Sequence, residues 1–132
     1  MRAVNSLIGA GILLASASIA QAHTPEPPTP ITIALSNFKF DPGAINLHHG
    51  QSYILTLANK VGGSHDFAAP RFFQSVTLDP RDRAAVTHGV VDMPGEKIVQ
   101  LHLTAPAPGT YEFHCSHFMH SSFGMKGNFV VD

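Results

Sequence analysis

The chain has 132 residues, with nine acidic and eight basic side chains and a formal net charge of −1 when its nine histidines are neutral. It contains no basic run or stripe, which argues against a nucleic-acid or anionic-membrane partner. The sole cysteine, Cys115, cannot form a disulfide within the chain. It is therefore a link to another chain, an inert buried thiol or a metal ligand.

Residues 1–22 have the features of a secretory signal peptide. Arg2 supplies the positive start, an apolar run follows, and Ala20 and Ala22 form a small-residue cleavage motif. The run is short for a membrane span. We therefore expect export to the periplasm and a mature protein that begins at His23 and has no membrane span.

Residues 23–30 hold four prolines and predict an extended lead-in. Residues 31–132 then form one predicted domain with the period-two alternation of strands. Strands are expected over residues 31–36 with an extension to 40, and over 44–48, 51–58, 84–87, 96–104, 111–115 and 128–131. Residues 68–94 are irregular, and a short helix or a bulge begins at Arg71. These spacings favour a sandwich or barrel over βαβ units.

Alternation within the last strands also predicts which side chains face the core. Val99, Leu101 and Leu103 are expected to point inward and His102 outward, because successive strand side chains lie on opposite faces. By the same rule Cys115 enters the interior, whereas its neighbour His114 faces away.

Residues 111–127 concentrate metal donors in one short segment, which contains the cysteine, three of the nine histidines and two of the four methionines. Cys115, His120 and Met125 stand five residues apart, and His65 follows a Gly-rich stretch fifty residues upstream of Cys115. A thiolate, two imidazoles and a weak thioether are the donor set of a mononuclear blue-copper centre, built to cycle one electron between Cu(II) and Cu(I). Zinc accepts the same thiolate and imidazoles.

Several other donors have two interpretations each. His114 and Met119 are expected to be ordinary loop residues. His117 either competes as a ligand or forms a second, weaker copper site with His114. His23 either chelates copper through its amino group and imidazole or is simply the residue after the cleavage site. The remaining histidines are expected on solvated faces: His48, His49, His88 and His102.

The donor spacing and strand order together resemble those of the cupredoxin family, over about residues 31–131. The resemblance implies an all-β, Greek-key β-sandwich of about eight strands that binds one copper. It assigns His65, Cys115, His120 and Met125 as ligands, with Met125 the weak axial one. The five-plus-five spacing is similar to that of rusticyanin, auracyanin and the type 1 sites of multicopper oxidases, and the Met-Lys-Gly ending is similar to that of azurins.

Two positions depart from the family pattern. Many cupredoxins place Asn directly after the first ligand to tie two loops together, whereas this chain has Asp66, which adds a negative charge near the metal. In multicopper oxidases, histidines on both sides of the cysteine reach a three-copper cluster, but here Ser116 follows Cys115. We therefore expect no oxidase activity and no enzyme.

The expected function is one-electron transfer through a transient contact with a redox partner. Phe118 and Phe123 flank His120 in sequence and would form an apolar contact surface around it. The alternative is a periplasmic copper buffer, carrier or resistance protein that uses the same centre. The surplus histidines and methionines favour this alternative, and in either case a monomer is expected.

Overall fold

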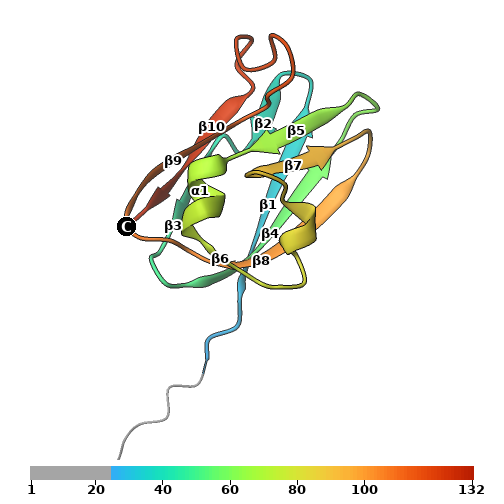
Figure 1. Cartoon of the computed structure of the whole chain (residues 1–132). Helices are drawn as coiled ribbons and strands as arrows, with labels where there is room; N and C mark the ends of the chain where they lie inside the picture. The colour runs from blue at the N-terminus through green and yellow to red at the C-terminus, as the bar shows by residue number, and fades with distance from the viewer. Residues whose placement is uncertain (1–24) are drawn as a thin grey trace, which may run out of the picture.

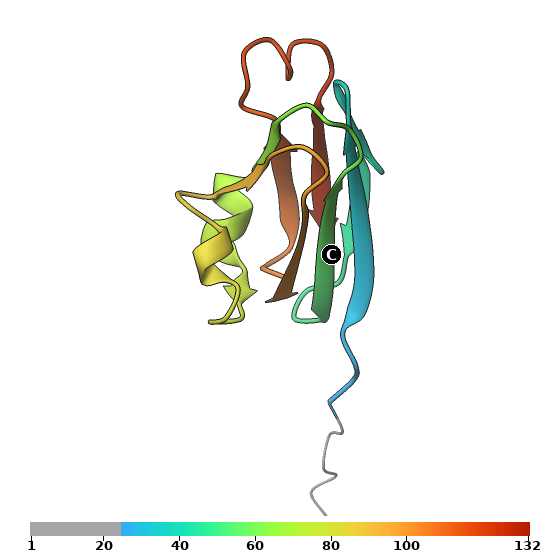
Figure 2. The ribbon, with the colours of Figure 1, turned by 90° about the vertical axis from the view of Figure 1, so that its right-hand side faces the viewer.

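The computed structural model describes residues 25–132, so the predicted signal peptide and His23 lie outside the described residues. Its ten strands form two five-stranded sheets that pack face to face (Figures 1 and 2). This arrangement confirms the predicted Greek-key β-sandwich. It has two strands more than expected, and the short strands β2 (Lys39–Asp41) and β6 (Thr77–Leu78) form the two edges of the first sheet.

The first sheet has the order β2-β1-β4-β8-β6. Its longer strands are β1 (Thr29–Ser36), β4 (Ser52–Asn59) and β8 (Ile98–Thr104). Strand β1 begins two residues before the predicted start at 31 and pairs with β4 in parallel, whereas the other pairs are antiparallel. The described N-terminal residues leave the sandwich below β1 (Figure 1).

The second sheet has the order β3-β10-β9-β5-β7. It contains β3 (Ala44–Leu47), β5 (His65–Ala68), β7 (Val90–Met93), β9 (Gly109–His114) and β10 (Lys126–Val131). Strands β5 and β9 are antiparallel, with Ala68 opposite His114. The residues at the start of β5 therefore lie beside those that follow β9. The chain brings His65 next to Cys115 in this way.

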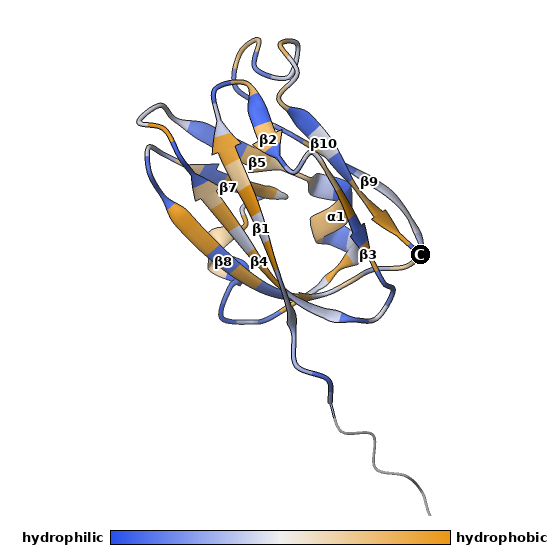
Figure 3. Cartoon of the chain, turned by 180° about the vertical axis from the view of Figure 1, so that it is seen from behind, coloured by the Kyte–Doolittle hydropathy of each residue, from blue (hydrophilic) through white to orange (hydrophobic). Residues whose placement is uncertain are grey.

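The core between the sheets is rich in aromatic rings. Hydrophobic and hydrophilic residues are interspersed along the strands that enclose it (Figure 3). A short helix, α1 (Pro70–Ser75), inserts Phe72, whose ring stacks on Phe129 at 4.1 Å between centroids. The rings of Phe67 and Phe113 lie 4.8 Å apart between centroids, near the end of the sandwich that carries His65 and Cys115. Burying each such ring contributes roughly 1.5–3 kcal/mol. The predicted inward positions of Leu101, Leu103 and Cys115 are confirmed.

The strand predicted over residues 84–87 is wrong. A 3-10 helix, η1 (Arg83–Ala85), occupies this position, with the Ala85 amide donating to the Asp82 carbonyl. Thr87 and Val90 then exchange two backbone hydrogen bonds across a tight turn, so the strand begins only at Val90. Local turn hydrogen bonds thus replaced the sheet pairing that the apolar residues suggested. Within residues 25–132, no helix has the length and apolar character needed to cross a bilayer.

The loop of residues 59–64, which leads into His65, is held by the side chain of Asn59. This amide is buried and donates to the carbonyl oxygens of Gly63 at 2.8 Å and Met93 at 2.9 Å. Its own oxygen accepts the Val61 amide at 3.1 Å. Asn59 therefore ties the loop both to itself and to the end of β7, and so fixes where His65 begins its strand.

Replacing Gly127 with alanine should destabilise the fold. A Cβ atom at this position in β10 would overlap the carbonyl oxygen of Gly43 and lie 2.5 Å from the ring of Phe113. Because the Gly43 obstacle is backbone, we expect Gly127→Ala to lower the free energy of unfolding by about 1–3 kcal/mol in urea denaturation. Gly62→Ala is the matched control, since nothing lies within 4 Å of its added Cβ. Equal midpoints for the two variants would contradict this packing.

Asn59→Ala should also destabilise the protein, because it leaves the carbonyls of Gly63 and Met93 without their buried donor. The expected loss is about 1–3 kcal/mol, the usual cost of an unsatisfied buried polar group. Thermal unfolding of the metal-free protein measures it. An unchanged midpoint would mean that the loop is held by its backbone contacts alone.

Candidate metal centre

His65 is the first residue of β5, and its imidazole is buried. The strand that carries it lies in the second sheet between β9 and β7, so its position is fixed from both sides. The Nε2 atom is buried and has no hydrogen-bond partner among the described residues. The polar contacts of this ring are instead made by Nδ1, which faces Cys115 and His120.

Cys115 directly follows β9 and is completely buried. Its amide donates to the carbonyl of Met125 at 3.1 Å, and the amide of Met125 donates to the carbonyl of His120 at 3.0 Å. These two bonds close the loop of residues 115–125 on itself. The loop therefore returns His120 and Met125 to the cysteine. This loop, between β9 and β10, projects from one end of the sandwich (Figure 1).

Three donor atoms converge at this end. The Nδ1 atoms of His65 and His120 are 3.3 Å apart, and the Cys115 Sγ lies 3.9 Å from the first and 3.3 Å from the second. A point equidistant from the three atoms is about 2 Å from each, which matches a bond between a first-row metal and an imidazole nitrogen. This is the one group of three or more His, Cys, Asp or Glu donors suited to a metal ion in the described residues.

The chemistry of the donor set fits a soft, first-row metal. Each Nδ1 atom has a lone pair that it can give to a metal when the other ring nitrogen carries the proton, and a deprotonated Sγ atom has lone pairs of its own. A metal ion between the three atoms would accept a lone pair from each. A thiolate with two imidazoles suits copper, and a buried thioether beside it completes the set that tunes a copper potential.

The electrostatics of the site favour the metal-binding form of the histidine but not of the cysteine. Burial, and then the neighbouring charges of His120 and His117, lower the pKa of His65 below its ordinary value. Burial also raises the pKa of the Cys115 thiol. These shifts favour the neutral imidazole of His65 and the protonated thiol of Cys115, and metal binding must release the thiol proton.

Met125 is fully buried, and its backbone joins the two predicted ligands Cys115 and His120. The structure thus brings all four predicted ligand residues to one end of the molecule. Its assignment as the axial ligand stays a prediction, because the backbone contacts place the residue and not its sulfur.

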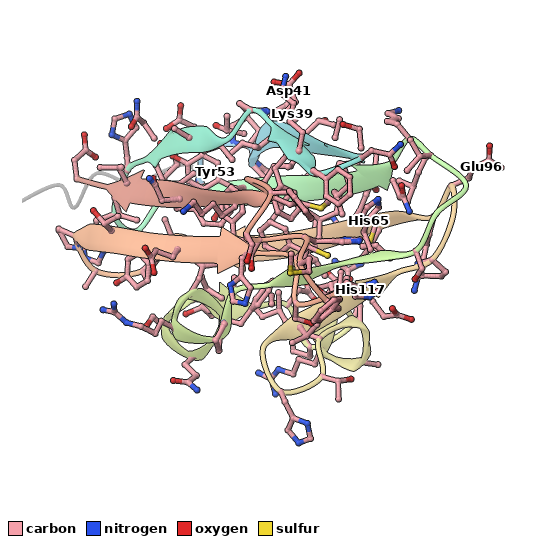
Figure 4. The ribbon with its side chains drawn as sticks, turned by 90° about the horizontal axis from the view of Figure 1, so that it is seen from above. Lys39, Asp41, Tyr53, His65, Glu96 and His117 are labelled. Carbon is pink, nitrogen blue, oxygen red and sulfur yellow. The ribbon has the colours of Figure 1, made fainter. Side chains whose placement is uncertain are left out.

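The surplus donors are distributed around this centre. His117 is half-buried, its ring lies 5.4 Å from that of His120, and its Nε2 is 3.9 Å from Asp66. In the view onto this end, His65 and His117 lie over the middle, whereas Glu96 is at the rim (Figure 4). His114 is half-exposed on the opposite face of β9 from Cys115, and Met119 is exposed.

Phe38 is a site residue that sequence reasoning missed. It lies in the turn between β1 and β2, with a left-handed φ of 59°, which is unusual for a bulky side chain. Its ring packs edge-on against His120 at 5.1 Å and Phe123 at 5.2 Å. Sequence gave no signal for this contact, because the residues are about eighty positions apart. Asn59 was also missed, although an Asn before a Gly-rich loop is a recognisable turn signal.

The predicted apolar side chains beside His120 are exposed. Phe118 is 91% exposed and Phe123 is 61% exposed, and Phe123 packs against Phe38, which in turn contacts the half-buried His120. We call Phe38, Phe118 and Phe123 the aromatic rim. Exposed rings grouped in this way are typical of surfaces that contact another molecule.

Solved structures share this fold. Auracyanin from Roseiflexus castenholzii matches with a TM-score of 0.58 and 23% identity, covering 81% of this chain and 99% of that one. Auracyanin A, a blue copper protein from Chloroflexus aurantiacus, matches with a TM-score of 0.58 and 20% identity, covering 80% and 100%. A laccase from Pediococcus acidilactici matches with a TM-score of 0.60 and 16% identity, covering 92% of this chain but 31% of that one.

Comparison with curated protein sequences finds no match. A family model described as a cupredoxin-like domain does match, over residues 7–131. This match spans nearly the whole chain and includes the strands and the loop that bring the donors together. The chain therefore belongs to the cupredoxin-like family.

Proposed function

We propose that this protein is an exported carrier of single electrons that holds one copper ion through His65, Cys115, His120 and Met125. The observation that carries this proposal is the convergence of one sulfur and two Nδ1 atoms within 3.9 Å of one another at the end of a rigid sandwich. Copper bound there would alternate between Cu(II) and Cu(I). The protein itself supplies a fixed set of donors that suits both states.

The role of the scaffold is to keep these donors still. Cys115 and Met125 are fully buried, and two backbone hydrogen bonds link them to each other and to His120. Ordered contacts of this kind limit how far the ligands can move when charge changes. Hydrogen bonding and burial around the sulfur also tune the potential of such a centre.

The aromatic rim supports electron exchange at His120. Phe38 contacts the one half-buried histidine of the cluster, and Phe118 and Phe123 are exposed on the same loop as this histidine, so the rim would let a partner approach this ligand closely while excluding water. A small apolar patch suits a weak, short-lived contact, which an electron carrier requires. The partner would therefore be a redox protein that contacts this end of the molecule.

Electron transfer without conversion of a substrate is the activity we favour over oxidase chemistry. The chain covers nearly all of the auracyanins but about a third of the laccase. Ser116 also stands where a second histidine would follow the cysteine. Residues 1–22, with their signal-peptide pattern, support export to the periplasm.

A second candidate function is copper handling in the same compartment. The observation in its favour is that Met119 is exposed and His117 is half-buried on the ligand loop itself, next to the donor cluster. Thioether and imidazole groups at the surface could pass Cu(I) to or from the centre. Copper stoichiometry and exchange rate distinguish the two functions.

A copper titration of the mature protein tests the electron-transfer proposal. We expect one equivalent of Cu(II) to give an intense thiolate-to-copper band, reversible reduction and fast electron self-exchange. Cys115→Ser is the control and should lose this band, because the thiolate is its source. Two or more equivalents, slow exchange or ready release to a chelator would instead support copper handling. A band retained in Cys115→Ser would contradict the ligand assignment.

Met125→Leu should keep copper bound but raise the reduction potential, because it removes a donor that favours Cu(II). The fold should tolerate the change, since swaps between methionine and leucine in cores usually cost less than about 1.5 kcal/mol. Cyclic voltammetry of the variant beside the wild type measures the shift. Complete loss of copper would show that Met125 is more than a weak axial ligand.

A further inference from the structure

Asp66 is a buried carboxylate with no assigned role, and it lies between the two segments that supply the metal donors. It is the second residue of β5, directly after His65, and it is only 6% exposed. Its Oδ1 accepts the backbone amide of Ser116 at 2.7 Å, and its Oδ2 accepts the Ser116 hydroxyl. Because Ser116 directly follows Cys115, this pair connects the strand of one donor to the loop of the others.

The contacts of Asp66 match those of an ionised carboxylate. Such a group only accepts hydrogen bonds, and both of its partner groups in Ser116 donate. Neither donor carries a charge that would cancel that of the carboxylate. Among residues 25–132, the basic side chain within ion-pair distance of Asp66 is His117, at 3.9 Å, and no lysine or arginine reaches it. The site therefore contains a negative charge that its hydrogen bonds hold but do not neutralise.

We propose that Asp66 is a positioning residue whose buried charge lowers the reduction potential of the metal centre. This proposal rests on the proposed copper-binding function. Reduction adds one electron to the centre, which brings negative charge toward the carboxylate. Cu(II) with one thiolate has a net positive charge and is attracted to Asp66, whereas Cu(I) with the same thiolate is neutral and is not attracted. Asp66 thus favours Cu(II) over Cu(I).

The size of the effect follows from burial. Charges near a protein surface are weakened by water and salt, but those in the interior interact more strongly because the effective dielectric constant is lower. Asp66 is bonded in sequence to one proposed ligand and hydrogen-bonded to the neighbour of another, so it lies close to the metal. We expect its charge to change the ratio of Cu(II) to Cu(I) affinity by about tenfold.

Asp66→Asn tests this role, because the amide keeps the size of the side chain and an oxygen to accept the Ser116 amide. The ratio of Cu(II) to Cu(I) affinity should fall about tenfold, which for one electron is a rise of about 59 mV in reduction potential. Both quantities are measured, the ratio by competition with chelators and the potential by voltammetry. The thermal midpoint of the metal-free variant reports separately whether the tie between the segments is intact.

Asp92→Asn is the matched control. Asp92 lies directly opposite Asp66 in the pairing of β5 with β7, but its side chain is exposed. The substitution therefore removes the same charge one strand away in water, where it is screened. A rise in reduction potential in Asp66→Asn that Asp92→Asn does not reproduce supports the proposal. Equal shifts, or no shift in Asp66→Asn, would overturn it.

Ser116→Ala provides a second variant if Asp66→Asn fails to fold. It leaves the carboxylate charged but removes the hydroxyl that donates to Oδ2, so the potential should move down. An upward shift would overturn the role of charge. Failure of the proposed function looks different, because the wild type would then bind copper without reversible cycling. If the wild type cycles reversibly but Asp66→Asn has the same reduction potential, only the proposed role of Asp66 is contradicted.

Discussion

The structure depends on a close approach of three polar donors inside an apolar sandwich. The sulfur of Cys115 and the Nδ1 atoms of His65 and His120 are held 3.3 to 3.9 Å apart, so one metal ion could contact all three. One comes from the start of β5 and two from the loop between β9 and β10, and each is fixed by neighbours other than the metal. Strand pairing fixes His65, the end of β9 fixes Cys115, and backbone bonds within the ligand loop fix His120.

The fold and the donor set could be predicted because both leave local signals. Period-two alternation located most strands, and it correctly placed Cys115 inside and His114 on the other face. Fixed spacing of soft donors identified Cys115 and His120, and the need for another imidazole then pointed to His65. These features depend on chemistry within short segments, so a single sequence is enough to find them.

The parts that could not be predicted depend on distant contacts or on competition between local structures. Phe38 meets His120 only because the β1–β2 turn and the ligand loop share one end of the sandwich. The apolar residues at 84–87 suggested a strand, yet turn hydrogen bonds around Asp82 formed a 3-10 helix instead. Asp66 was visible as a departure from the family pattern, but its two bonds to Ser116 needed the folded chain.

The position of the N-terminal segment has a practical consequence. Residues 25–28 leave the sandwich at the end opposite the ligand loop, as Figure 1 shows. A linker attached ahead of Thr29 would therefore anchor the protein to an electrode or bead with the aromatic rim turned outward. Immobilised in this orientation, the molecule would offer its histidine ligand to soluble molecules rather than to the support.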